Sequence, residues 1–435
     1  MKNIRAKFRE WSLDRRLARN VISLYGVQFA SYLLPLVTVP YLTRVLGVAT
    51  WGLVAFAQAF GAYAGIGIEY GFQLSATRAV AKNRESTGEL ANLVAGVMGA
   101  KVLLATTIVI LAYFLESWIP LFRKNPIYLW AAVFWAIAQS FSMLWYYQGF
   151  ERMRLVAVLD VVGKAAATAG IFIIVRHPGD GWKVLVLQGS GSLISVIIAT
   201  ALVYREIPIR LPAWGLVRDT LRMGWSMFLF RSSMSLYGAG NAFILGLFAS
   251  PEAVGIYAGA ERLARALMGL LAPIHQSLYP RISHLVQNNR PAANRLARFG
   301  MFLMSSTGLV LALAALLGAP WAVPLILGKS FGESIPVLQV MAALPLLDAL
   351  GTMFGVLWMV PLGLDRQFNR VILSGGLINL ILAVALAPHF AEIGMAAAVV
   401  GTEVFVVVAL FAALRRRGLT PLTAGGNGAQ SAARG

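Results

Sequence analysis

The sequence contains no cysteine and only four histidines, which lie far apart at His177, His275, His284 and His389. Without cysteine, the chain has no disulfide, no thiol nucleophile and no thiolate metal ligand. It also lacks a Walker loop, an HExxH helix and a nucleophile elbow. We therefore expect no metal site, no cofactor and no catalytic residues.

Charge is scarce as well. Charged residues make up 13% of the chain and hydrophobic residues 58%, whereas about a quarter of a soluble domain is charged. Apolar runs of about 20 residues recur from end to end, and each is long enough to cross a hydrocarbon core. No soluble domain of useful size fits between them. The sequence therefore predicts an all-α polytopic membrane protein.

Turn signals rich in glycine, proline and polar residues separate the apolar runs. We predict twelve spans, at residues 20–43, 51–72, 91–114, 127–148, 157–175, 184–203, 224–248, 253–279, 298–318, 335–360, 370–388 and 392–414. The predicted segments are a basic N-terminal arm (1–19), an N-lobe (20–203), a cytoplasmic linker (204–223), a C-lobe (224–414) and a disordered tail (415–435). The arm places Ile4, Phe8 and Trp11 on one helical face, so it either lies on anionic lipid or is a disordered positive tail.

The net charge of +19 would suit a nucleic-acid partner, but the charge follows the predicted topology. With the N-terminus inside, 26 of the 37 basic residues fall on the inside and 6 fall in outside loops. This bias is the positive-inside signal of membrane proteins. We therefore expect both termini in the cytoplasm and no nucleic-acid partner.

The two predicted lobes carry a short internal repeat. The stretch "TWGLVAFAQAF" (50–60) aligns with "AVGIYAGAERL" (253–263) at an offset of 203 residues, which places Gly52 on Gly255. Both stretches begin the second helix of a six-helix half. Two such halves related by pseudo-symmetry around a central cavity are a common plan for transporters.

Five basic residues lie within predicted spans, where an isolated charge costs at least about 2.5 kcal/mol. They are Lys101, Lys164, Arg231, Arg262 and Arg265. Intramembrane charges usually face the bundle interior, and several cations around one cavity would bind a strongly anionic group such as a pyrophosphate. Together with Arg44, from the first outside loop, these residues are the candidate substrate-binding set.

Other interpretations of three of these cations stay open. Lys164 and Arg231 each lie about 10 Å from the cytoplasmic end of a span, so their side chains could snorkel to the interface. Arg265 follows Glu261 by one helical turn, so the two residues could form a structural ion pair.

Three acidic residues are candidates for carrying protons or for balancing the cationic set, namely Glu69, Asp348 and Glu403. The sequence does not decide between these two roles. Prolines mark candidate hinges, because proline removes a helix hydrogen bond and permits bending. Pro35 and Pro40 lie in the first span and Pro273 in the eighth, and Pro345 predicts a kink in the tenth span beside Asp348.

Four stretches resemble one family. They are "LPLVTVPYLTRVLGVATWG" (34–52), "EYGFQLSATRAVAKNR" (69–84), "YYQGFERM" (146–153) and "VGIYAGAERL" (254–263). The chain resembles the Wzx-type flippases of lipid-linked polysaccharide repeat units, within the MOP exporter superfamily that also contains the MATE transporters. The resemblance implies twelve helices in two lobes, a cationic central cavity, and a place in the bacterial inner membrane. It also implies transport of an undecaprenyl-pyrophosphate-linked oligosaccharide from the cytoplasmic to the periplasmic leaflet.

Other functions compete with this one. The alternatives are another exporter of the superfamily, for lipid II or drugs, and a membrane enzyme of envelope polysaccharide assembly. The enzyme is disfavoured because no loop is long enough to carry an extramembrane active site. The expected partners are the lipid-linked oligosaccharide and membrane lipids, with a polysaccharide polymerase and chain-length proteins as further candidates. We expect a monomer.

Overall fold

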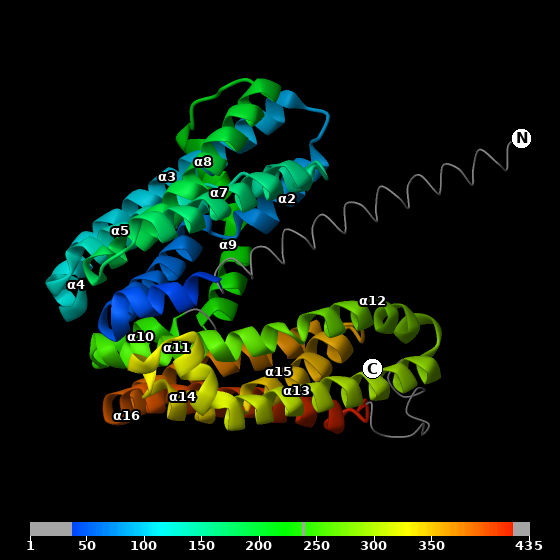
Figure 1. The fold of residues 1–435 in the computed structure, drawn as a ribbon. Helices are drawn as coiled ribbons and strands as arrows, with labels where there is room; N and C mark the ends of the chain where they lie inside the picture. The colour runs from blue at the N-terminus through cyan, green and yellow to red at the C-terminus, as the bar shows by residue number, and fades with distance from the viewer. Residues whose placement is uncertain (1–36, 237–239, 421–435) are drawn as a thin grey trace, which may run out of the picture. The chain divides into compact units, whose positions relative to one another are not determined.

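The computed structural model describes the backbone of residues 37–236 and 240–420, together with their side chains apart from those of Ser226 and residues 230–236. Throughout these ranges the regular structure is helical, and no strand occurs in them. The chain forms two compact units (Figure 1). Unit 1 consists of the described residues up to Gly47 and of Ala57–Ser232, and unit 2 consists of Val48–Phe56 and the described residues from Ser233 onward.

Unit 1 is built from a helix over residues 37–69, apart from its Val48–Phe56 stretch, and from the helices that follow it. The helix over 37–69 is interrupted at Gly47, where φ is +71°. The others are α2 (Phe72–Lys82), α3 (Thr87–Trp118), α4 (Pro120–Lys124), α5 (Pro126–Ser140), α6 (Leu144–Gly149), α7 (Met153–Ile174), η1 (Pro178–Asp180), α8 (Gly181–Glu206) and α9 (Trp214–Leu236). Helix α5 packs against α3 and α8, and α7 packs against α8, as their parallel ribbons in Figure 1 show.

Unit 2 repeats this pattern of long and broken helices. Its elements are α10 (Asn241–Phe248), α11 (Pro251–Gly269), α12 (Ala272–Asn288), α13 (Arg290–Ile326), η2 (Lys329–Phe331), α14 (Ser334–Met341), α15 (Leu344–Phe354), the π-helical turn η3 (Gly355–Met359) and α16 (Asp365–Arg416). Helix α13 packs against α12, α14 and α15, and α16 packs against α10, α14 and α15.

Local sequence explains where several of these helices begin. Ser86 accepts a hydrogen bond from the Glu89 N–H at the start of α3, and Asn289 accepts one from the Ala292 N–H at the start of α13. Such caps satisfy donors that the first turn of a helix leaves without an intrahelical partner. Ser250 caps α11 in the same way, and Pro251 follows it in the first turn, where its missing N–H costs nothing.

Eight helices of the described residues are long and apolar enough to cross a membrane. They are Val37–Lys82, Thr87–Trp118, Pro126–Gly149, Met153–Ile174, Pro178–Glu206, Arg290–Ile326, Ser334–Met359 and Asp365–Arg416. Their outer faces expose large apolar side chains, such as Phe302, Trp321 and Leu325 on α13. A surface of this kind is typical of contact with lipid. The protein is therefore a multi-pass membrane protein.

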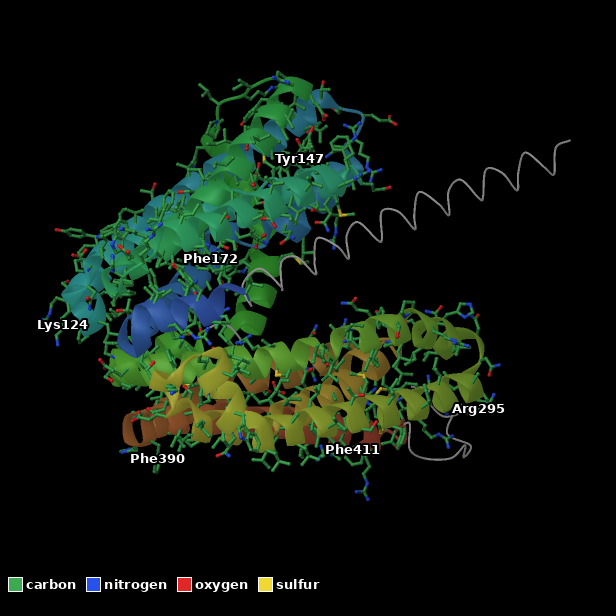
Figure 2. All side chains as sticks on the ribbon, viewed as in Figure 1. Lys124, Tyr147, Phe172, Arg295, Phe390 and Phe411 are labelled. Carbon is green, nitrogen blue, oxygen red and sulfur yellow. The ribbon has the colours of Figure 1, made fainter. Side chains whose placement is uncertain are left out.

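The prediction of twelve spans goes further than these eight helices show. The long helix Asp365–Arg416 is broken at Ala391, where φ is +45°, between the predicted spans 370–388 and 392–414. Phe390, beside the break, is exposed (Figure 2). Helices α9 and α11, which overlap the predicted seventh and eighth spans, carry four charged residues each and are not among the eight. The number twelve stays a prediction.

Val48–Phe56 belongs to unit 2 because it packs closely against α11 at two glycines, Gly52 and Gly255. A Cβ atom built on Gly52 would lie 1.8 Å from the carbonyl oxygen of Pro251, and one on Gly255 would lie 2.1 Å from the carbonyl oxygen of Val48. Any side chain at either position would clash with backbone, so the two helices can approach this closely only through glycine. These two glycines are the pair that the internal repeat aligns.

Candidate functional site

Lys101 is the only lysine or arginine among the buried residues of the described chain, with 1% of its surface exposed. It lies in the middle of α3, and its Nζ atom donates hydrogen bonds to the carbonyl oxygens of Ser140 (2.7 Å) and Ser142 (3.4 Å). Its ammonium group also lies 6.0 Å from the centre of the Phe141 ring. The buried charge is thus satisfied by backbone oxygens at one short segment.

That segment is a break between α5 and α6. The last carbonyls of a helix have no intrahelical donor, so a cation at a helix C-terminus is favourable in both hydrogen bonding and electrostatics. The Ser140 hydroxyl donates to the carbonyl oxygens of Ala136 (2.6 Å) and Gly65 (3.2 Å). The second of these bonds ties the break to the helix over 37–69.

The helix over 37–69 is itself broken near this point. Tyr70 and Gly71 have left-handed φ angles of +50° and +74°. The Glu69 carboxylate accepts hydrogen bonds from the N–H groups of Gln73 (2.6 Å) and Gly71 (3.2 Å), and so caps the first turn of α2. A tyrosine in the left-handed region costs roughly 1–3 kcal/mol, which surrounding structure must offset.

Both breaks act on Lys101. Glu69, at the first break, is the acidic group that acts electrostatically on Lys101, while Ser140 and Ser142 hold its Nζ atom at the second break. We call Glu69, Lys101, Ser140 and Ser142 the break cluster. Broken membrane helices are the elements from which many transporters build their substrate and ion sites. The break cluster is therefore the candidate functional site of unit 1.

A small cavity of about 50 Å³ lies beside the break cluster, with Ser142 in its lining. The polar part of its lining comes from Gln139, Ser142, Asp160, Ser192 and Ser195. The Asp160 carboxylate forms a 2.7 Å ion pair with Lys164 one helical turn later on α7, and both side chains are partly exposed. The candidate cation Lys164 thus has a partner on its own helix.

In unit 2, the possible ion pair of the eighth predicted span is present. Arg265 lies 2.8 Å from Glu261 on α11, and the Tyr257 hydroxyl donates to the same carboxylate oxygen at 3.4 Å. Arg262 lies between the two on the same helix and is half-buried. The structure therefore pairs Arg265 with Glu261, and Arg262 is next to that acid in sequence.

The remaining candidates are spread over several elements. Asp348 is half-buried on α15 and forms no hydrogen bond or ion pair with another described residue. Glu403 is half-buried on α16, and Arg44 is exposed on the helix over 37–69. The side chain of Arg231, on α9, and the whole of Pro35 lie outside the described residues.

Prolines begin two of the broken helices in unit 2. Pro273 stands in the first turn of α12, directly after the break at Leu270 and Leu271, and Pro345 stands in the first turn of α15. The predicted kink at Pro345 is confirmed. Pro40 lies within a helical stretch, where Thr43 donates to its carbonyl oxygen at 3.4 Å. Whether these prolines act as hinges stays a prediction.

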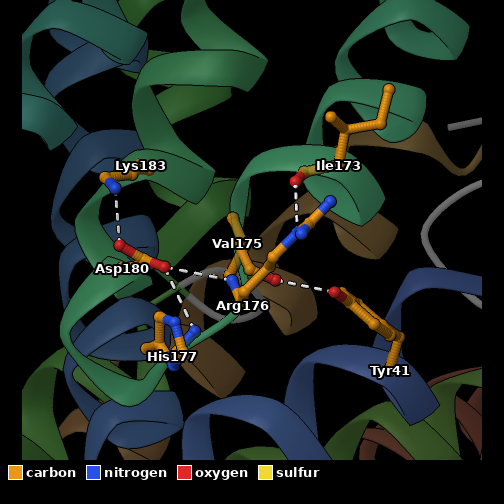
Figure 3. Close-up of polar contacts among 7 residues, drawn as sticks. All are labelled: Tyr41, Ile173, Val175, Arg176, His177, Asp180 and Lys183. Carbon is orange, nitrogen blue, oxygen red and sulfur yellow. Dashed lines mark hydrogen bonds and ion pairs between the residues drawn. The ribbon is translucent and has the colours of Figure 1, made fainter.

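Sequence reasoning missed two polar contacts that fix loops in unit 1. The Asp180 carboxylate accepts hydrogen bonds from the N–H groups of Arg176 and His177 and pairs with Lys183 (Figure 3). The Tyr41 hydroxyl donates to the Val175 carbonyl at 2.7 Å (Figure 3). The aspartate after "HPG" is a turn signal that could have indicated the first contact. No local pattern indicates the second, because it joins residues far apart in sequence.

Two of the stretches that carry the family resemblance meet in space. Arg84 donates from Nε to the Gly149 carbonyl at 2.7 Å and pairs through Nη2 with Glu151, also at 2.7 Å. Arg152 pairs with Glu206 at 3.0 Å. These residues hold the loop after α2 against the loop after α6 and the end of α8. They therefore stabilise the scaffold around the break cluster.

No group of three or more metal-ligating side chains occurs within residues 37–236 and 240–420. A family model described as "Polysaccharide biosynthesis protein" matches residues 17–286. The chain belongs to the polysaccharide biosynthesis protein family.

Two curated relatives support this membership. The "Putative O-antigen transporter" of Escherichia coli (strain K12) is 32% identical over 392 residues, which cover 90% of this chain and 94% of the relative. A Shigella dysenteriae protein of the same description is 30% identical over 412 residues, covering 92% of this chain and 100% of that protein. The predicted resemblance is confirmed at the level of the family, and so is the prediction of a transporter rather than an enzyme.

Solved structures show that this polysaccharide biosynthesis protein shares its fold with known transporters. The lipid II flippase MurJ, in an inward closed conformation, matches with a TM-score of 0.71 and 14% identity, covering 91% of this chain and 87% of MurJ. An inward-facing multidrug resistance MATE transporter of the MOP superfamily matches with a TM-score of 0.60 and 16% identity, covering 90% and 100%. At these identities the likeness concerns the fold alone.

Proposed function

We propose that this protein is a flippase that moves undecaprenyl-pyrophosphate-linked oligosaccharide repeat units from the cytoplasmic to the periplasmic leaflet. Transport occurs by alternating access of a cationic central cavity between two pseudo-symmetric six-helix lobes. Both termini lie in the cytoplasm, and the protein resides as a monomer in the bacterial inner membrane. The observation that carries the proposal is the match, over 90% of the chain, to a relative described as an O-antigen transporter.

The charges of the molecule support this substrate class. A pyrophosphate with a large polar glycan needs cations in an otherwise apolar protein, and guanidinium groups bind phosphate oxygens in pairs. We propose Arg231, Arg262, Arg265, Arg44 and Lys164 as the cations that meet the pyrophosphate during transport. Lys101, whose Nζ atom is held by backbone carbonyls, adds its positive charge to the electrostatic attraction for the pyrophosphate from within the break cluster. Glu69, Asp348 and Glu403 balance these charges or couple transport to an ion.

Arg231 provides the most direct test, because phosphate binding and snorkelling give different results for its lysine variant. A bidentate phosphate contact uses the guanidinium geometry, so Arg231→Lys should keep only part of the transport and Arg231→Ala should nearly abolish it. A snorkelling side chain needs only to reach the interface, so lysine would be silent and alanine mild. The measurement is restoration of surface polysaccharide in a deletion strain, with immunoblots for abundance and Arg298→Ala as an exposed control.

Full transport by Arg231→Ala at normal abundance would remove Arg231 from the proposed set. The substrate itself is tested by extracting lipids from the deletion strain. Accumulation of a lipid-linked glycan on the cytoplasmic side supports the proposed function. Accumulation of lipid II instead would indicate that this protein transports lipid II, and the proposal would be wrong.

A further inference from the structure

The N-terminal half of α9 carries an aromatic and basic face that the proposed function does not use. Tyr70, Trp214, Arg218, Leu221, Arg222 and Trp225 line a pocket of about 250 Å³ within unit 1. The five α9 residues share one helical face, because their spacing follows the helical repeat. We call these six residues the α9 face.

The opposite side of α9 is fixed by close packing. Thr220 and Val217 are buried, and a Cβ atom built on Gly96 of α3 would lie 2.4 Å from the Thr220 hydroxyl oxygen. A Cβ atom on Gly224 would lie 2.9 Å from the Tyr70 carbonyl oxygen. Helix α9 is therefore seated tightly on α3 and on the break at Tyr70. The α9 face cannot turn inward to bury its arginines.

The two arginines of the α9 face have no partner among the described residues. Neither Arg218 nor Arg222 forms a hydrogen bond, an ion pair or a ring contact there, although Asp219 lies between them in sequence. Trp214 and Trp225 on the same face are 67% and 52% exposed. Two guanidinium groups one turn apart, flanked by tryptophans, present phosphate-binding donors beside aromatic rings that favour the lipid headgroup level.

The segment that leads into α9 supports a position at the membrane surface. Ile209 and Leu211 are 74% and 87% exposed, which is unfavourable in water and favourable against lipid. The lining of the α9 face contains no carboxylate, amide or aliphatic hydroxyl, which are groups suited to bind the hydroxyls of a sugar. A phosphate without a glycan therefore fits the α9 face better than a glycolipid does.

We propose that the α9 face binds the headgroup phosphate of an anionic membrane phospholipid. Arg218 and Arg222 donate to the phosphate oxygens, and Trp214, Trp225 and Tyr70 pack around the glycerol and the upper acyl chains. This site is distinct from the proposed transport cavity. It fixes the depth of α9 in the leaflet, next to the break that Tyr70 and Gly71 form.

The test is native mass spectrometry of the full-length protein in detergent with phosphatidylglycerol, and with phosphatidylcholine of identical acyl chains. Phosphatidylglycerol should bind more tightly, and Arg218→Gln with Arg222→Gln should weaken it by about fivefold per arginine. Arg218→Lys with Arg222→Lys should retain an intermediate affinity, because charge remains and the paired donor geometry is lost. Arg415→Gln with Arg416→Gln, on the exposed end of α16, removes the same charge and should leave binding unchanged.

Several results would overturn the proposal. Equal binding of the two lipids, equal losses in the α9 and α16 variants, or unchanged binding in the glutamine pair would each exclude a phosphate site on the α9 face. Displacement by millimolar inorganic phosphate alone would show a soluble anion site instead. Tighter binding of undecaprenyl pyrophosphate than of phosphatidylglycerol would assign the α9 face to the transport substrate. If the double variant does not elute as a monodisperse species, the single variants Arg218→Gln and Arg222→Gln give the same test.

Discussion

Units 1 and 2 each break their helices at corresponding places, but they stabilise the breaks with different chemistry. In unit 1 the breaks lie at Tyr70–Gly71 and at residues 141–143. In unit 2 they lie at Leu270–Leu271 and Ala342–Ala343. The offset of 203 residues from the internal repeat relates each pair to within a few residues. Breaks that recur in both units are part of the plan of the fold.

Unit 1 holds its breaks with charge. Two residues there have left-handed backbone, a carboxylate caps the new helix, and Lys101 binds the carbonyls that the other break leaves open. In unit 2, the same offset places Met304 at the position of Lys101 and Ala272 at that of Glu69. Met304 is completely buried in an apolar core with Met353 and Leu410.

Unit 2 holds its breaks with tighter turns and proline. At the first break, Leu270 and Leu271 stay right-handed, and their N–H groups reach back three residues, to the carbonyls of Leu267 and Met268. Such 3₁₀-type bonds satisfy the helix end without a side chain. Pro273 and Pro345 then begin the following helices without needing a donor. The comparison shows that a broken membrane helix needs its backbone groups satisfied, and that charge is only one way to do so.

The largest effect is expected from placing the charge of unit 1 into unit 2. Met304→Lys would bury an ammonium group in an apolar core, where no carbonyl from a break of the unit 1 type is available. An unpaired buried charge costs about 3 kcal/mol or more. We expect the variant to accumulate poorly in the membrane, whereas Met304→Leu, which keeps the volume, should accumulate normally. Quantitative immunoblots of the membrane fraction measure both. Normal accumulation of Met304→Lys would show that unit 2 can supply the ligands after all.

The reverse exchange should have a smaller but clear effect. Lys101→Met leaves the Ser140 and Ser142 carbonyls without their donor, and each buried group left unsatisfied costs about 1–3 kcal/mol. We expect a lower melting temperature for the detergent-purified protein and slower transport. Lys82→Met is the matched control, because that lysine is exposed in the last turn of α2 and is not among the proposed substrate-binding cations. Similar losses in the two variants would mean that the position of the lysine does not matter.

Much of this comparison could be predicted from the sequence. The hydrogen bonds from Lys101 to the carbonyls of Ser140 and Ser142 could not. Hydropathy and turn signals predict helices, and Pro345 predicts one of the breaks. The break at residues 141–143 contains neither proline nor glycine, so only Ser142 and the preceding Ser140 set it apart in an apolar run. The partners of Lys101 are backbone carbonyls contributed by another helix. No side-chain pattern encodes backbone acceptors, so the sequence gives no sign of this contact, and a substrate-binding role for Lys101 stays a prediction.

A third, smaller effect should follow from the cap at the first break of unit 1. Glu69→Ala removes both hydrogen bonds to the start of α2, and loss of such a cap costs about 1 kcal/mol. Glu69→Gln keeps an acceptor oxygen but removes the charge that acts on Lys101. We therefore expect the melting temperature to fall in the order wild type, glutamine, alanine, with Glu85→Gln, on an exposed loop, unchanged. Equal values for glutamine and wild type would show that the carboxylate charge contributes nothing to the break cluster.

The smallest change in stability per substituted residue is expected where unit 2 relies on proline. Pro273→Ala with Pro345→Ala makes the unfolded chain more flexible and should cost about 0.4–1 kcal/mol per site. The new N–H groups can also extend the helices across the breaks. We therefore expect amide hydrogen exchange to slow at Leu270–Leu271 and at Ala342–Ala343, and transport to slow because these points bend less.

Pro320→Ala is the control for this last pair, because α13 stays continuous through that proline. It should alter neither exchange at the breaks nor transport. Slower exchange with unchanged transport would mean that the breaks of unit 2 are packing features and not hinges. Unchanged exchange would mean that the 3₁₀-type turns hold without their prolines. In that case, the two units would differ only in charge, and the break cluster of unit 1 would be the sole specialised element of the pair.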